Sequence, residues 1–239
     1  MDNAPVAPRR TLLRMITFGG LVTAAGSLTA ACGKGSGKAS AASSGSPASA
    51  AGSASGADMI MFIRHGEKPK ENGDKPPFGI TEDGERNAHA LLVRGWQRAG
   101  ALVTLFAPDS GEPREGLRRP DAVYAAGPQP GAKGLRPSET VAPVAAKLGV
   151  RTNVTYRTGD EKALAKELAG RHGCTLVSWE HHGIVEIVKA LGGEVRPSPP
   201  KDWPDARFDL VWVLVRSGSG WTFTQVPQLL LAGDSKDPA

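Results

Sequence analysis

The sequence predicts an α/β fold, a three-layer sandwich with a mostly parallel central sheet. Short apolar runs typical of buried strands alternate with amphipathic stretches of helical periodicity as far as residue 191. Two further strand-like runs follow at 208–215 and 221–226, and Ser217-Gly218-Ser219-Gly220 between them favours a tight turn. We therefore expect an antiparallel hairpin at the sheet edge near the C-terminus.

The other elements are expected to follow one another in a simple order. Ahead of the final hairpin, strands are expected at 58–63, 121–125, 153–156 and 174–179. Helices are expected at about 92–107, 138–148, 160–170 and 183–191. Ser138 and Asp160 suit the N-caps of the second and third helices, and Gly149 suits the end of the second.

The first residues of the chain have the pattern of an export signal. Arg9-Arg10 begin a twin-arginine motif, and a mostly apolar stretch follows it. Leu28-Thr29-Ala30-Ala31-Cys32 is typical of a bacterial lipobox, although Thr29 stands where leucine is usual. We expect residues 1–32 to be a twin-arginine and lipoprotein signal with lipidation at Cys32. An uncleaved transmembrane anchor is the alternative.

The composition then changes twice along the chain. Residues 33–57 are almost all Gly, Ser and Ala and are expected to form a flexible linker. Residues 58–239 remain as one domain, of a size that suits a single core. A lipid anchor would hold this domain at the extracytoplasmic face of a membrane, in the periplasm or at the cell surface.

Charge and cysteine content exclude some functions. The formal net charge is +5, but the basic residues are scattered and not interleaved with aromatic ones, so no nucleic-acid partner is expected. Of the two cysteines, Cys32 is assigned to the lipobox and Cys174 is expected to be a buried thiol. Two cysteines so placed make no zinc pattern, and neither a metal nor a cofactor is expected.

The most informative motif is Arg64-His65-Gly66, which directly follows the first apolar run. In open α/β sheets, ligands bind at the carboxyl ends of the strands. A guanidinium can hold phosphate oxygens there, while an imidazole can attack phosphorus. The glycine is expected to allow a sharp turn of the backbone.

Two more strands are expected to bring similar groups to the same edge. Arg136 follows the strand at 121–125, and His181 and His182 follow the strand at 174–179. We expect two guanidinium groups and two imidazoles to meet around one phosphate. The adjacent His181 and His182 are expected to point in different directions after their strand, which is a further reason to expect no metal.

These motifs resemble those of the histidine phosphatase superfamily, which has the phosphoglycerate mutase-like fold. Arg64-His65-Gly66 matches its R-H-G motif, and Arg136-Pro137-Ser138-Glu139-Thr140 matches its second arginine with the following [E/Q]-T. His181-His182-Gly183 matches its late histidine, and alignment of the glycine favours His181 over His182. The resemblance spans about residues 58–226.

The resemblance implies a role for each matched residue. His65 would attack phosphorus and become a phosphohistidine, with one ring nitrogen held by a backbone carbonyl. Arg64, Arg136 and His181 would hold the phosphoryl oxygens. The remaining contacts with substrate are expected from Gly66, Glu67 and His182. The family's general acid has no clear counterpart here; the candidates are Glu67, Glu180, Asp160 and Glu161, and a substrate with a good leaving group needs none.

The predicted function is that of an extracytoplasmic, histidine-dependent phosphatase, a phosphomonoesterase-type hydrolase. It would remove a phosphoryl group from a small phosphorylated substrate through a phosphohistidine on His65. A non-catalytic lipoprotein that binds phosphate or an envelope partner is the alternative. A phosphoglycerate mutase is less favoured, because mutases need a phosphorylated sugar-acid cofactor found inside cells.

Overall fold

A computed structural model of the protein describes residues 58–70, 73–131 and 133–238. The predicted signal, its lipidation site Cys32 and the linker lie outside the described residues. Within the described ranges, no helix is both long and apolar enough to cross a bilayer. The elements are, in chain order, β1 (Met59–Arg64), α1 (Val93–Phe106), β2 (Ala122–Ala125), α2 (Arg136–Leu148), β3 (Thr152–Asn153), α3 (Glu161–Ala169), β4 (Cys174–Trp179), α4 (His181–Ala190), β5 (Val195–Arg196), β6 (Leu210–Ser217) and β7 (Gly220–Pro227).

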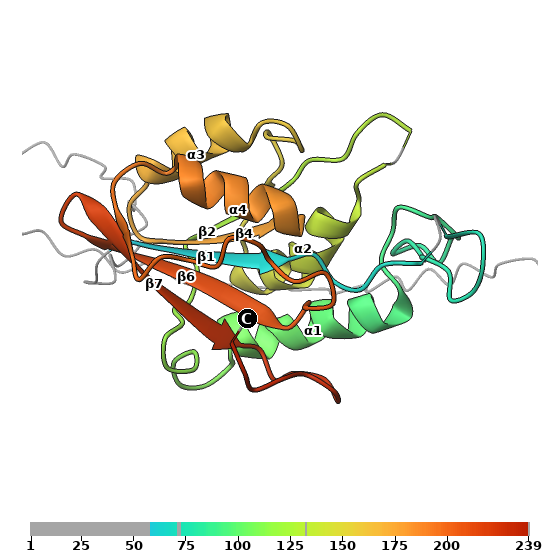
Figure 1. Ribbon diagram of the computed structural model, residues 1–239. Coiled ribbons are helices and arrows are strands. Elements are labelled where there is room, and N and C mark those ends of the chain that lie inside the picture. The colour runs from blue at the N-terminus through green and yellow to red at the C-terminus, as the bar shows by residue number, and fades with distance from the viewer. Residues whose placement is uncertain (1–57, 71–72, 132, 239) are drawn as a thin grey trace, which may run out of the picture. The chain divides into compact units, whose positions relative to one another are not determined.

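The strands form one sheet in the order β3-β2-β4-β1-β6-β7-β5 (Figure 1). β1 lies at its centre, parallel to β4 and antiparallel to β6. β2 pairs in parallel with both β3 and β4, while β6 and β7 form the expected antiparallel hairpin. The predicted α/β class with a mostly parallel sheet is confirmed. The sheet edge on the hairpin's side is the unpredicted β5, which pairs in parallel with β7.

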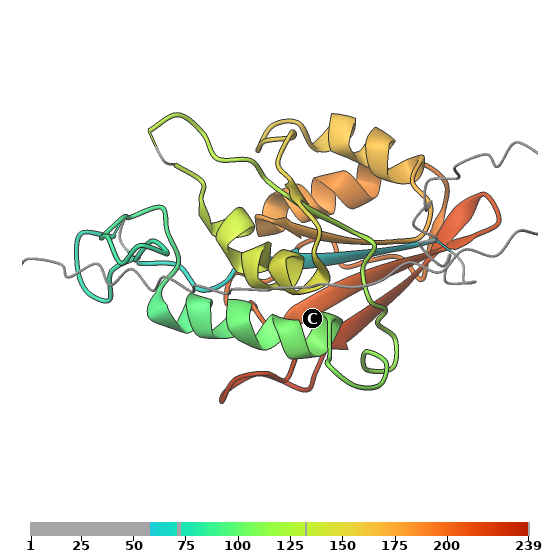
Figure 2. The ribbon, with the colours of Figure 1, turned by 180° about the vertical axis from the view of Figure 1, so that it is seen from behind.

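Helices cover both faces of the sheet. α1 and α2 lie on one face, and α3 and α4 lie on the other (Figures 1 and 2). β1 serves both layers because its side chains alternate: Met61 and Ile63 pack with α1 and α2, while Phe62 packs with α3 and α4. Cys174 belongs to the first of these cores, and burial raises the pKa of its thiol to about 11. The prediction of a buried cysteine is confirmed.

Two of the predicted helix caps differ from the structure. α2 begins at Arg136, two residues earlier than expected, because Pro137 suits the first turn of a helix. Ser138 therefore lies inside α2, where its hydroxyl donates to the carbonyl of Leu135. Asp160 stands at the N-cap of α3 without capping it, since its carboxylate accepts from the N–H of Arg157. Gly149 ends α2 in the left-handed region, as predicted, with φ of 68°.

The strand directions decide which segments meet at one edge. The parallel strands β1, β2 and β4 end there with their carboxyl ends. β6 runs the other way beside β1, with Ile63 opposite Val211, so its amino end reaches the same edge. Residues 197–209, which precede β6, are thereby brought beside the end of β1.

Candidate active site

Arg64 is the last residue of β1 and is 1% exposed. Its Nη1 donates to the main-chain carbonyl of Asp205 and reaches that of Arg207 at 3.4 Å. The guanidinium carbon lies 4.0 Å from the centroid of the Phe208 ring. Burial lowers the pKa of Arg64 to about 10, so the side chain stays charged at neutral pH. The segment before β6 thus holds one cation at the sheet edge.

His65 follows directly and is 5% exposed. Its Nδ1 lies 2.8 Å from the carbonyl oxygen of Gly66, which can only accept, so Nδ1 carries the proton and Nε2 has a lone pair. Burial lowers the pKa of His65 to about 3; the Gly66 carbonyl opposes this effect, and the charges of Arg64 and Arg136 add to it. The ring is therefore neutral at physiological pH, with its carbonyl partner as predicted.

Gly66 lies in close approach to the backbone of α1. A Cβ at this position would lie 3.1 Å from both Cα and the carbonyl oxygen of Gly95, near the start of α1. Its φ is not among the positive values, so the turn of the backbone here does not use the left-handed region. The N–H of Gly66 donates to Oγ1 of Thr140 at 2.8 Å, which ties the residue to α2.

Arg136 opens α2 and brings the second guanidinium. Its Nη2 donates to the carbonyl of Ala88 at 2.8 Å, and its Nε reaches the carbonyl of Ala90 at 3.4 Å. Burial lowers its pKa from the usual value. One turn along α2, the hydroxyl of Thr140 donates to the carbonyl of Arg136 at 2.7 Å. Thr140 therefore connects the Arg136 turn to the loop that carries His65.

His181 is the first residue of α4 and follows the N-cap Glu180, whose carboxylate accepts from the N–H groups of His182 and Gly183. The ring is buried, and neither of its nitrogens has a hydrogen-bond partner. Nε2 lies against the carboxylate of Asp205, and Nδ1 lies 3.6 Å from Oε2 of Glu180, without hydrogen-bond geometry. Burial, above all, lowers the pKa of His181.

His182 lies closer to His181 than expected. The two ring centroids are 3.9 Å apart, with 37° between the ring planes. The prediction that these rings point in different directions is wrong, because both residues belong to the first turn of α4 and not to extended chain.

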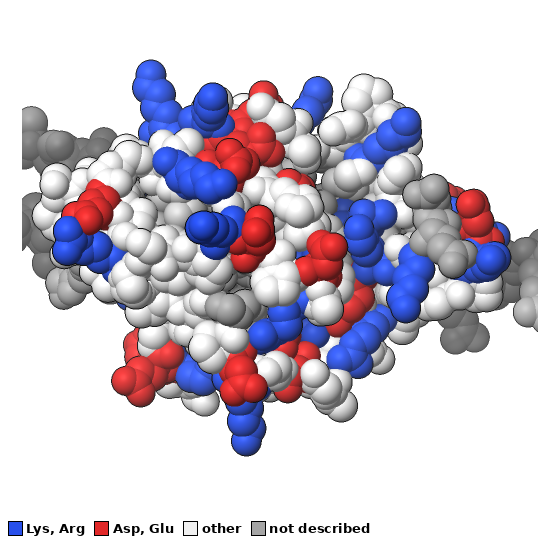
Figure 3. All heavy atoms as spheres, in the orientation of Figure 1, with Lys and Arg blue, Asp and Glu red and all other residues white. Residues whose placement is uncertain are grey.

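A cavity of about 690 Å³ opens at this edge. Figure 3 shows Lys and Arg side chains beside the end of β1, with acidic side chains among them. The residues that line the cavity are Lys68, Pro69, Lys70, Ala88, His89, Arg136, Asp205, Ala206 and Phe208. Its walls thus combine cationic groups with one carboxylate, one imidazole and one phenyl ring, which suits an anionic ligand with an organic part.

Contacts and charges connect Arg64, His65, Arg136 and His181. Arg64 and His65 are adjacent, the charge of Arg136 acts on His65, and the charge of Arg64 acts on His181. Asp205 links them, because its main chain accepts from Arg64 while its carboxylate faces His181. Sequence analysis missed this residue. The predicted antiparallel hairpin could have indicated it. If the first strand of the hairpin pairs with β1 in antiparallel fashion, the loop before that strand lies beside the carboxyl end of β1.

Glu67 does not join this group. Its carboxylate accepts from Arg98 at 2.9 Å and from Arg94 at 3.1 Å, both on α1. The general-acid candidates Glu180, Asp160 and Glu161 also have other partners. Glu180 caps α4, Asp160 binds the Arg157 N–H, and Glu161 accepts from the indole N–H of Trp179 at 3.0 Å.

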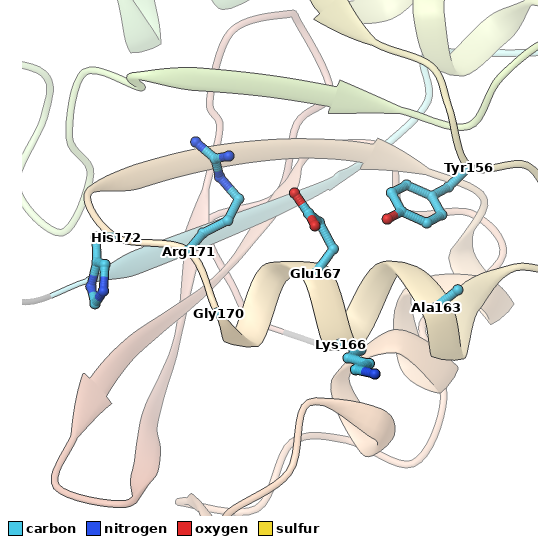
Figure 4. Close-up of a pocket in the computed structure, with 7 residues that line it drawn as sticks. All are labelled: Tyr156, Ala163, Lys166, Glu167, Gly170, Arg171 and His172. Atoms are coloured by element: carbon cyan, nitrogen blue, oxygen red, sulfur yellow. The ribbon is translucent and has the colours of Figure 1, made fainter.

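A second cavity, of about 640 Å³, lies along α3 (Figure 4). Glu167 and Arg171 extend from this region toward the strands, where both contact the hydroxyl of Tyr124, at 3.0 and 3.1 Å. Glu167, Arg171 and Tyr124 thus form one hydrogen-bonded group. None of the residues singled out from the sequence lines this cavity, so we place the candidate site at the end of β1.

No protein-family model matches the sequence, and no curated protein matches it either. Among solved structures, the fold is similar to that of the protein histidine phosphatase SixA, determined as a complex with tungstate. The sequences are 15% identical, the match covers 71% of this chain and 97% of that chain, and the TM-score is 0.46.

Proposed function

We propose that the protein is a histidine-dependent phosphohydrolase that removes a phosphoryl group from a small phosphorylated substrate. The observation that carries this proposal is the state of His65. Its ring is buried and neutral, its Nδ1–H is bound to the Gly66 carbonyl, its Nε2 has a lone pair, and the charges of Arg64 and Arg136 act on the ring. This arrangement suits a nucleophile that must attack an anion at neutral pH.

The proposed reaction has two steps. In the first, Nε2 of His65 forms a bond to phosphorus, and the bond from phosphorus to the leaving oxygen breaks with its electron pair. Arg64 and Arg136 stabilise the charge on the remaining phosphoryl oxygens, and His181 contributes a hydrogen bond. In the second step water attacks phosphorus, the P–N bond breaks, and inorganic phosphate leaves while His65 returns to its neutral form.

Substrate size follows from the cavity. A volume of about 690 Å³ accommodates a small organic phosphate, and the exposed Lys68 and Lys70 at its rim would attract it. The twin-arginine pattern supports export of the protein, and the lipobox supports a lipid anchor on Cys32 that would hold it at the extracytoplasmic face of a membrane. We propose this location for the enzyme.

The test uses the purified full-length protein and an aryl phosphate, whose good leaving group needs no acid catalyst. We expect hydrolysis by the wild type and its loss in His65→Ala. The matched control is His172→Ala, a change at an 88% exposed ring before the amino end of β4, which should leave activity unchanged. Equal hydrolysis by wild type and His65→Ala would refute the proposal.

The intermediate and the anion site provide separate readouts. During turnover, an acid-labile phosphoryl group should be trapped on His65 and found by mass spectrometry. Vanadate, a mimic of the transferring group, should bind and inhibit. Vanadate binding without hydrolysis would favour the non-catalytic phosphate-binding alternative. Phosphoryl transfer between phosphoglycerates with added cofactor would instead favour the mutase.

A further inference from the structure

Three side chains at the rim of the candidate site can share one metal ion. His181, His182 and Asp205 each offer a ligand atom, and these atoms all lie within 4.8 Å of one another. His182 and Asp205 are exposed, while His181 is buried. Among the residues that the structure describes, this is the one group of three or more metal-binding side chains whose ligand atoms lie this close together.

The state of His181 points independently to a ligand. Its side chain is only 9% exposed, yet neither ring nitrogen has a hydrogen-bond partner. Buried polar atoms without partners cost free energy, so they usually mark a contact that is made with a bound group. Nε2 lies against the carboxylate of Asp205 without hydrogen-bond geometry, so this nitrogen is directed into the cluster.

The surroundings of His181 also fit a ligand to metal. Behind the ring, Oε2 of Glu180 lies 3.6 Å from Nδ1, a small movement away from a hydrogen bond. A carboxylate behind the other ring nitrogen is the arrangement that orients histidine ligands in metal sites. The main-chain bonds that Glu180 accepts from the start of α4 hold this carboxylate in place.

We propose that His181, His182 and Asp205 bind one divalent transition-metal ion and that zinc is the ion that fits best. Two imidazoles and one carboxylate are typical zinc ligands, and three protein ligands leave a fourth position open. The proportion of nitrogen ligands disfavours magnesium, which prefers oxygen. This corrects the expectation from sequence that the two histidines could not act together.

Zinc binding here has a consequence for the proposed function, on which this step rests. A metal bound to Nε2 of His181 removes that nitrogen from the phosphoryl group. Zinc should therefore inhibit hydrolysis, and the inhibition should follow the occupancy of a single site. The cluster would then act as a metal-sensitive control on the phosphatase.

The direct test is calorimetric titration of the full-length protein with zinc chloride, without substrate. We expect one saturable site, and affinity at least about tenfold weaker in both His182→Ala and Asp205→Asn, because even outer-shell changes cost this much. The control is His172→Gln, which removes the other His–Asp contact, with Asp58 at 3.0 Å, and should leave zinc affinity unchanged. Magnesium chloride should give no such binding.

The outcomes separate the two proposals. No saturable zinc site, or unchanged affinity in both cluster variants, would overturn the metal site, whatever the phosphatase assay shows. Saturable binding in a protein that does not hydrolyse aryl phosphate would leave the metal site standing and refute the enzyme. Where both are present, zinc should inhibit the wild type at least about tenfold more strongly than it inhibits His182→Ala, each relative to its own zinc-free rate.

Discussion

The N–H of Gly66 and the hydroxyl of Thr140 are joined by a hydrogen bond of 2.8 Å, across 74 residues of chain. The same hydroxyl donates to the carbonyl of Arg136. Oγ1 of Thr140 therefore touches both halves of the candidate site, the loop that carries His65 and the turn that carries Arg136. It holds in register two groups that the chain places far apart.

Thr140→Val tests this link. Valine keeps the shape of the buried side chain but leaves the Gly66 N–H without a partner, which should lower the free energy of unfolding by about 1–3 kcal/mol. The Gly66 carbonyl also orients His65, so kcat on an aryl phosphate should fall by roughly ten- to a hundredfold. Urea unfolding and steady-state kinetics measure the two effects.

A matched threonine serves as the control for this change. Thr104 is exposed on α1, where its hydroxyl donates to the carbonyl of Ala101. Thr104→Val should change stability by less than about 0.5 kcal/mol and leave kcat intact. Similar losses in both variants would show that Thr140 has no special role in the site.

Glu67 should stabilise the fold through one of its two arginine partners far more than through the other. The side chain of Arg98 is 2% exposed and also pairs with Asp234, whereas that of Arg94 is 45% exposed. Arg98→Ala removes the buried cation from both carboxylates, leaves Asp234 without this ion pair and should cost about 3–5 kcal/mol. Arg94→Ala should cost less than about 1 kcal/mol. Chemical denaturation measures the free energy of unfolding of both variants. Equal losses of stability would contradict the argument from burial.

The buried neutral His65 should make stability depend on pH. Its pKa is about 3 in the folded protein against the ordinary 6.5, so the unfolded chain takes up a proton first. The associated stability is present above about pH 6.5 and is lost as pH falls toward 3. Unfolding free energies from pH 7 to 4 should fall more steeply for the wild type than for His65→Gln, by on the order of 1 kcal/mol per unit. Parallel curves would mean that His65 is not held neutral.

Glu139 should show the opposite dependence. Burial raises the pKa of its carboxyl to about 7, although the Leu91 N–H and Arg136 oppose this effect. Its contribution to stability is full below about pH 4.5 and is lost as pH rises through 7.

Glu139→Gln keeps an oxygen to accept from the Leu91 N–H, a bond of 2.8 Å. After allowance for exposure to water, the variant should therefore be more stable than the wild type at pH 8 by on the order of 1 kcal/mol. At pH 5 the two should be equal. A constant difference across this range would contradict the raised pKa.

Most of the fold could be predicted because its strands and helices are separated by clear changes in apolar period. β1 and β4 are buried on both faces; the first five residues of β1 are a continuous apolar stretch, and only Thr175 and Ser178 interrupt the apolar residues of β4. The two-residue strands β3 and β5 could not be placed well, because a strand of two residues has no period to read. The start of α2 was misplaced because Ser138 looks like a cap, while Pro137 allowed an earlier start.

The site was predictable where residues directly follow parallel strands. Arg64, His65 and His181 are of this kind, and topology alone brings them to one edge. Asp205 was missed because it precedes an antiparallel strand, and the pairing of that strand with β1 joins residues more than a hundred positions apart. The ion pair of Glu67 with Arg98 could not be predicted either, because it depends on how α1 packs beside the loop after β1.

The central place of β1 determines when the site can form during synthesis. Met59 pairs with Cys174 on one side and with Val215 on the other. Contacts between such distant positions form late in folding. A growing chain on the ribosome therefore carries Arg64 and His65 from an early stage without the strands that hold them. The candidate site can be complete only after residue 217 has emerged, so its chemistry is withheld until β6 has been made.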